Sequence, residues 1–244
     1  MVNHAEFSSF AASRRSTRDF LNTPVPAEII QSILTDAMTA PSWSNTRPYK
    51  VAVATGSARD RISADFLARW AALSAARQGG LVAKLRLAIT RFGLPTSNAM
   101  ISKPYVDELK LRSRKIGADL YGLLGVKRGD AKARDAQWAR NYEFFGAPVE
   151  LFIFTHTSLG KYSASDAGLF MQNLMLSAHA HGLGSCAQGA VAIWQDAIAK
   201  EFEIPKGYKL LCGIAIGYAS DAAVNTFKAE RLPISEITLL PKKN

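Results

Sequence analysis

Three arginines lie within a few positions of one another near the start of the chain, in the stretch "SRRSTRDF" at residues 13–20. Arg14, Arg15 and Arg18 are interleaved with the hydroxyls of Ser16 and Thr17. Arginine presents a rigid fork of N–H donors that matches phosphate oxygens, and neighbouring hydroxyls complete such a site. Taken alone, these residues favour a solvated helix end, with a phosphate site as the alternative.

Three further stretches could contribute to a binding site: "PSWSNTRP" at 41–48, "GLGSCAQGA" at 182–190 and "NTFKAERLP" at 225–233. The second begins like a dinucleotide-binding glycine motif, but Ala187 stands at the last glycine position and the stretch follows a predicted helix rather than a strand. A P-loop and a GxSxG elbow are both lacking in the sequence.

The histidines and cysteines do not indicate a metal centre. His179 and His181 stand two apart near a predicted helix end, where they point in different directions; stabilisation of the helix end by its dipole is the simpler interpretation. Cys186 and Cys212 form no CxxC pair, so neither a disulfide framework nor a zinc site is expected. Cys186 is interpreted as a small buried residue and not as a nucleophile.

The net charge of +10, from 30 basic and 20 acidic residues, raises the possibility of nucleic-acid binding. The densest charge, between residues 108 and 135, is interleaved with acids at helical spacing, which is typical of a solvated face. Attraction of small anions explains the excess equally well. The apolar runs are too short to span a bilayer, and the start of the chain does not resemble a secretion signal, so we expect a cytoplasmic protein without a membrane partner.

Hydrophobic periodicity predicts an α+β protein built around one sheet, as a single domain over residues 1–244. Helices are expected over 4–13, from Pro26 to Ala40, and over 57–78, 81–92, 104–124, 129–145, 163–182 and 194–202. Strands are expected over 49–56, 147–156 and 208–219, with a short strand and turn over 185–191 and a possible edge strand over 236–240. The order lacks the regular alternation of strands and helices of a dinucleotide-binding domain.

Five motifs in register resemble the FMN-dependent nitroreductase family: "RRSTRDF", "APSWSNTRPY", "GLGSCAQGA", "GIAIGYA" and "NTFKAERLP". The resemblance covers most of the chain, and only the helical region of about 57–146 is loosely matched. It implies a nitroreductase-like fold, with a central mixed or antiparallel sheet flanked by helices, and an intertwined homodimer. The stretch from residue 105 to residue 148 looks like the branch that reduces nitroaromatic acids.

The resemblance also assigns roles to individual residues. One group would hold the FMN phosphate and ribityl chain: Arg14, Arg15, Ser16, Arg18 and Arg231. A second group would reach the flavin bound to the other subunit: Pro41, Ser42, Trp43 and Asn45. A third would pass near the flavin N5 edge: Ala187, Gln188 and Gly189. No side chain is assigned a catalytic role, because the flavin itself carries the chemistry.

By resemblance, the activity is that of an FMN oxidoreductase, in which hydride passes from NAD(P)H through bound FMN to a nitroaromatic, quinone or similar small acceptor in two half-reactions at one site. Trp43, Arg47 and Tyr49 depart from the common pattern of small residue, glutamine and tryptophan. We therefore expect Trp43 to narrow the substrate pocket and Arg47 to bind an acidic group of substrate or of NADPH. The positive charge slightly favours NADPH over NADH.

Two alternatives stay open at this point. One is a flavoenzyme of the same fold with another reaction, such as ene reduction, dehalogenation or dehydrogenation, because a fold does not determine its chemistry. The other is a flavin-free basic module that binds nucleic acid or a protein partner.

Overall fold

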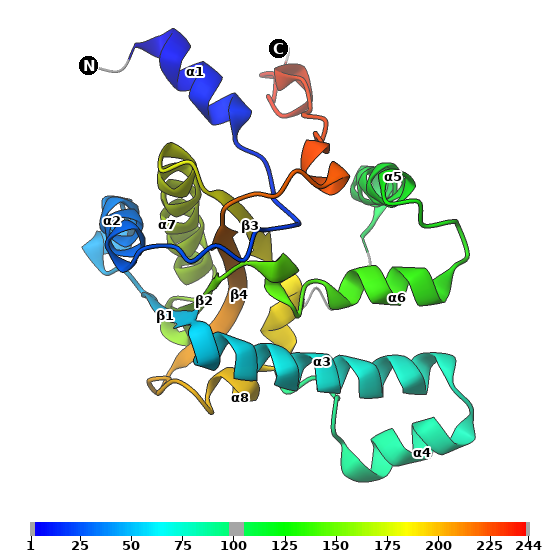
Figure 1. Cartoon of the computed structure of the whole chain (residues 1–244). Coiled ribbons are helices and arrows are strands. Elements are labelled where there is room, and N and C mark those ends of the chain that lie inside the picture. Colours follow the sequence, from blue (N-terminus) through cyan, green and yellow to red (C-terminus); the bar gives the residue numbers. More distant parts are fainter. Residues whose placement is uncertain (1–2, 98–104, 243–244) are drawn as a thin grey trace.

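The computed structural model describes residues 3–97 and 105–242, which form helical layers on both faces of one sheet (Figure 1). The four strands are β1 (Tyr49–Thr55), β2 (Val149–His156), β3 (Gly184–Gln188) and β4 (Tyr208–Gly217). Their order is β1-β2-β4-β3, and each neighbouring pair is antiparallel. The predicted α+β class with a central sheet is confirmed, and the pairing within the sheet is antiparallel throughout.

The helices follow the predicted order. They are α1 (His4–Ser13), α2 (Ala27–Ala37), α3 (Gly56–Gln78), α4 (Leu81–Thr90), α5 (Asp107–Leu123), α6 (Ala131–Ala139), α7 (Lys161–Ala180) and α8 (Gln195–Ile198). Pro104, where the sequence predicts the start of α5, lies outside the described residues. No helix in the described parts of the chain has the length and apolar character needed to cross a membrane.

The alternation of side chains along β2 supplies both halves of the core. Val149, Leu151 and Ile153 point to the face that α2 and α7 cover. Phe152 and Phe154 point to the opposite face, where they pack with α3 and with the segment that follows β3. Because β2 is central and covered on both faces, nearly all of its residues are buried, as in the strands of a doubly covered sheet.

Three predicted elements are wrong in detail. The helix predicted over 194–202 is only the short α8, Gln195–Ile198. The stretch 236–240 is not an edge strand: a 3-10 turn spans Ile234–Glu236, and Leu239 and Leu240 beyond it are 95% and 87% exposed. This tail lies beside α5, away from the sheet, so its apolar residues have no strand to pair with (Figure 1). The helix predicted over 129–145 is confined to Ala131–Ala139, and it could not extend through Phe144 and Phe145, whose φ angles are 54° and 55°.

Candidate functional site

The arginine-rich segment lies along β3, at the edge of the sheet. Ser16 forms a parallel bridge with Ser185, and the Thr17 amide donates to the Ser185 carbonyl over 3.0 Å. Gly184 makes this approach possible, because a β-carbon there would lie 2.8 Å from the Thr17 Cβ and 2.9 Å from its Cγ2. A glycine is therefore required where the backbone of residues 16–17 meets the sheet.

Arg14 and Arg231, far apart in sequence, lie close enough to repel each other. Partial burial and the charge of Arg231 lower the pKa of Arg14 below the ordinary arginine value. In the described parts of the chain, no carboxylate forms an ion pair with Arg14, Arg15, Arg18 or Arg231. Neighbouring cations without a counter-charge form a site that favours an anion, and a phosphate would relieve their repulsion.

The end of α1 packs against the C-terminal part of α7, through His179. The imidazole Nε2 lies 2.6 Å from the Ser13 hydroxyl, and its ring lies 5.1 Å from the Phe10 ring. Burial, followed by the charges of Arg14 and Arg15, lowers the pKa of His179. His179 lies in the last turn of α7, and its predicted interaction with the helix dipole stays a prediction.

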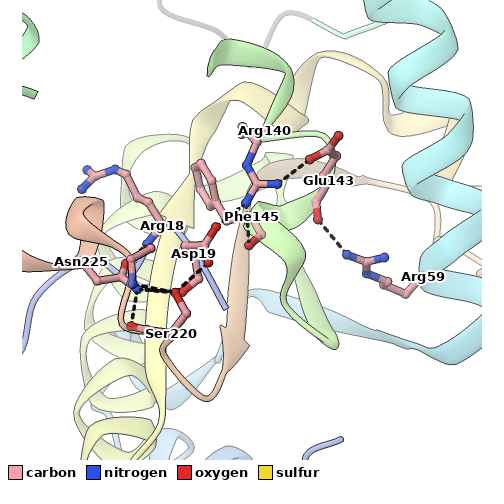
Figure 2. A network of polar contacts seen from close by, with 9 residues as sticks. Arg18, Asp19, Arg59, Arg140, Glu143, Phe145, Ser220 and Asn225 are labelled. Atoms are coloured by element: carbon pink, nitrogen blue, oxygen red, sulfur yellow. Dashed lines mark hydrogen bonds and ion pairs between the residues drawn. The ribbon is translucent and has the colours of Figure 1, made fainter. Parts of the chain in front are cut away.

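A polar network, missed in the sequence, joins the arginine segment to the chain before Arg231 (Figure 2). The Asn225 side chain accepts from the Arg18 amide over 2.8 Å and donates to the carbonyls of Asp19 and Ser220 over 2.8 and 3.1 Å. The Ser220 hydroxyl donates to Asp19 over 2.6 Å, and Arg140 pairs with the other Asp19 oxygen over 2.8 Å. Asn225 is the first residue of the motif "NTFKAERLP", so its polar side chain was the one feature of the sequence that could have indicated this network.

A cavity of about 470 Å³ lies beside this network. Its lining includes Arg18, Tyr121, Trp138 and Asn141, so it joins the arginine segment to the helical middle of the chain. A cavity of this size accommodates a small aromatic molecule or part of a cofactor.

The end of β3 presents its residues in different directions. Ala187 and Gly189 are exposed, whereas Gln188 is buried and donates to the Asn141 carbonyl over 2.8 Å. Burial raises the pKa of the Cys186 thiol to about 11, which confirms its interpretation as a small buried residue and not as a nucleophile.

The 41–48 loop lies elsewhere in the same chain. The Trp43 amide donates to Asp166 of α7 over 3.0 Å, and the Trp43 ring packs on Tyr162 with 4.7 Å between centroids. Asp166 and His179 are separated by about 20 Å along α7, at the rise of an α-helix. Within one chain, the predicted cofactor residues therefore form two separate groups, one at the loop and one at the arginine cluster.

The loop itself is exposed and held in an unusual backbone conformation. Trp43 is 57% exposed, so it is not a core residue. Ser44, Asn45 and Arg47 have positive φ angles of 48°, 57° and 45°, and Pro41 is exposed as well. The Ser42 hydroxyl accepts from the Arg47 amide over 3.0 Å, which stabilises the turn. A positive φ angle at a non-glycine residue costs conformational free energy. Such residues cluster at functional sites, and this loop holds three of them.

An antiparallel sheet between helices, with a cluster of arginines beside its β3 edge, defines the class of this α+β protein. The family model described as "Nitroreductase family" matches residues 11–218, and the chain belongs to this family.

Curated relatives and a solved structure agree with this assignment. A 4-nitrobenzoate reductase from Pseudomonas putida is 33% identical over 229 residues, covering 93% of this chain and 91% of its own. A chloronitrobenzene nitroreductase from Comamonas testosteroni is 32% identical over 226 residues, covering 92% of each. The FMN-dependent nitroreductase NfnB from Mycobacterium smegmatis, solved with NADPH, superposes with a TM-score of 0.82 at 29% identity, covering 98% of this chain and 100% of that one.

Proposed function

We propose that this protein is an FMN-dependent oxidoreductase that uses NAD(P)H to reduce a nitroaromatic or similar small acceptor. The observation that carries the proposal is the pair Arg14 and Arg231, two guanidiniums whose charges repel and which have no carboxylate partner among the described residues. The names of the relatives support the reaction class.

The residues present fit the phosphate end of FMN. Arg14 and Arg231 would supply charged donors, and the Ser16 hydroxyl lies on the same edge of the sheet. When bound, FMN supplies the two-electron chemistry between NAD(P)H and the acceptor. Arg18, at the rim of the 470 Å³ cavity, would place a positive charge beside the flavin ring. The exposed backbone at Ala187 and Gly189 would lie along the ring edge.

A titration of the apoprotein with FMN, followed by flavin fluorescence, tests the phosphate site. Arg14→Gln and Arg231→Gln should each weaken binding by about 10- to 150-fold, since a charge-assisted hydrogen bond contributes about 1.5–3 kcal/mol. Arg86→Gln is the matched control, because Arg86 is an exposed residue of α4 and its loss changes the net charge equally. A wild-type protein that takes up no FMN would refute the proposal.

We also propose that the site is completed by a second copy of this chain, as the separation of the 41–48 loop from the arginine cluster suggests. Pro41, Ser42, Trp43 and Asn45 of one protomer would then contact the FMN held by Arg14 of its partner. Complementation tests this arrangement. At an FMN concentration that saturates wild type but not Arg14→Gln, each of Arg14→Gln and Asn45→Ala should have little activity. Random dimers of the two co-expressed chains should regain about one quarter of wild-type activity, because half the dimers hold one intact site. No recovery would refute a shared site.

For the acceptor, we propose an aromatic nitro compound with an acidic group, bound through Arg47. The Arg47 guanidinium contacts only the Asn45 carbonyl in the described residues, over 3.3 Å, so its charge is available to a ligand. The 4-nitrobenzoate reductase activity named for one relative supports this class. Kinetics of Arg47→Gln with 4-nitrobenzoate and nitrobenzene test it: only the acid should lose kcat/KM. An equal change for both acceptors, with no change in NADPH over NADH preference, would refute the role.

A further inference from the structure

Glu150 is an ionisable residue in the middle of the core. It lies on β2, has 0% exposed surface, and shares a sheet face with Phe152 and Phe154. In the described parts of the chain, neither of its carboxyl oxygens has a hydrogen-bond partner. A buried carboxyl without partners is costly, so its presence in the core requires an explanation.

The carboxyl group lies over Gly213 of β4. A β-carbon at Gly213 would collide with the Glu150 Oε1 and would lie 2.8 Å from the Val191 Cγ2. The missing side chain of Gly213 thus provides the space that the carboxyl occupies. A bulkier residue at 213 would exclude it.

Gln188 lies directly beside this position. It pairs with Gly213 across the β3–β4 ladder, so its side chain emerges on the same face and one strand away from the Glu150 carboxyl. Gln188 is 2% exposed, and its Nε2 donates to the Asn141 carbonyl over 2.8 Å. Its Oε1 is buried without a partner. The unpaired Gln188 Oε1 and the unpaired Glu150 carboxyl therefore lie on one face of the sheet over neighbouring strands, where a proton on Glu150 would serve both.

We propose that Glu150 is a protonated positioning residue, which donates a hydrogen bond to the Gln188 Oε1, directly or through one enclosed water, and so fixes the end of β3. The inference rests on the proposed function in one respect, namely that residues 187–189 line the FMN ring. With Oε1 held by Glu150 and Nε2 held by Asn141, the Gln188 side chain is fixed at both ends, and the exposed backbone on either side of it is fixed in turn.

The charged and titratable groups around Glu150 support the neutral form. Burial raises the pKa of Glu150 well above its ordinary value, and the charge of Arg59 on α3 only partly opposes this. The Arg59 guanidinium donates instead to the carbonyls of Ala147 and Glu143, over 3.1 and 2.7 Å. The thiols of Cys186 and Cys212 are neutral, with pKa values of about 11 and about 12.

Infrared spectroscopy of the apoprotein tests the proton directly. The difference spectrum between wild type and Glu150→Gln at pH 7 should contain the carbonyl band of a protonated carboxyl group. A carboxylate band in its place would overturn the proposal. Stability gives a second readout. The folded state keeps a proton that the unfolded chain releases, so wild type should lose stability relative to Glu150→Gln as pH rises above the ordinary pKa of a glutamate. Parallel pH profiles would also overturn it.

Two variants then test the positioning role. Glu150→Gln can still donate a hydrogen bond to Gln188, whereas Glu150→Leu cannot. Amide hydrogen exchange of the apoprotein at residues 186–189 should be as slow in Glu150→Gln as in wild type and at least about tenfold faster in Glu150→Leu. FMN dissociation constants should follow the same order, and Glu203→Gln, at an exposed glutamate, is the control for the chemical change.

The outcomes separate the two proposals. A folded Glu150→Leu protein with wild-type exchange at 186–189 would overturn the positioning role, whatever its affinity for FMN. If Glu150→Leu does not fold, the infrared and pH comparisons of wild type with Glu150→Gln still decide the protonated state. A wild-type protein that binds no FMN would refute the proposed function and the link to the flavin ring, and would leave the hydrogen bond to be judged by the infrared result.

Discussion

The contact of Gly184 with Thr17 gives the sharpest prediction about how the site is built. Gly184→Ala would place a β-carbon 2.8 and 2.9 Å from two carbon atoms of Thr17 and still closer to its hydroxyl. Thr17 has little room to move, because its side chain is 4% exposed and its amide is bonded to Ser185. The added methyl must therefore displace the 14–18 segment from the edge of β3.

The expected cost is that of overpacking a buried site, about 1–3 kcal/mol. Urea unfolding of the apoprotein measures this free energy, and an FMN titration should show weaker binding in the same variant, because Arg14 moves with the segment. Gly117→Ala is the matched control. Gly117 lies inside α5 with open space around its added β-carbon, so the same substitution should stabilise by about 0.5–1 kcal/mol.

A double mutant separates local crowding from general damage. Thr17→Ala removes the hydroxyl and the methyl that the new β-carbon meets, so the pair Gly184→Ala with Thr17→Ala should be less destabilised than the sum of the two single changes. If Gly184→Ala unfolds and binds FMN like wild type, the reasoning is refuted. If the free-energy changes of Gly184→Ala and Thr17→Ala simply add in the double mutant, the contact with Thr17 is not the cause of the destabilisation.

Three further predictions concern other parts of the fold. Arg69→Met should cost about 3–5 kcal/mol in urea unfolding at pH 7, because the buried guanidinium pairs with Asp65 over 2.6 Å. Burial opposes ionisation of Asp65, but hydrogen bonds from Arg69 and a lysine lower its pKa overall. Wild type should therefore lose stability below about pH 4, and Arg69→Met should lose less stability over the same pH range. Burial raises the pKa of Cys186 and Cys212 to about 11 and about 12, so a thiol reagent at pH 8 should label neither before unfolding and both after it. Asn225→Ala should destabilise by about 1–3 kcal/mol and weaken FMN binding, and an unchanged melting temperature would show that its bonds to the arginine segment are dispensable.

Much of the fold was predictable because its signals are local. The apolar runs that became β2 and β4 and the Gly79-Gly80 end of α3 are properties of short windows of sequence. The tail at 236–240 has the same apolar character as a strand, yet it has no sheet edge to pair with. That information is tertiary, so the prediction of a strand there was wrong.

The motifs named candidate site residues but not the contacts that hold them in place. The motifs pointed to Arg14, Arg231 and the end of β3, whereas the contact that aligns them depends on a missing side chain at Gly184. The contacts of Asn225 and the complete burial of Glu150 were also hidden, since a residue type alone shows nothing of its partners. The Glu150 carboxyl reaches over Gly213, and Gly213 is the β4 partner of Gln188; neither fact is visible in the sequence.

The position of β3 at the sheet edge explains why the site forms there. An edge strand presents unpaired backbone groups that must be covered. Here the segment around Ser16 covers them at one end, and a bridge between Phe20 and Ala219 continues the cover beside β4. The same contacts hold Arg14 against the sheet. If a phosphate binds Arg14 and Arg231 as proposed, it should also stabilise the N-terminal segment that covers this edge, by mass action.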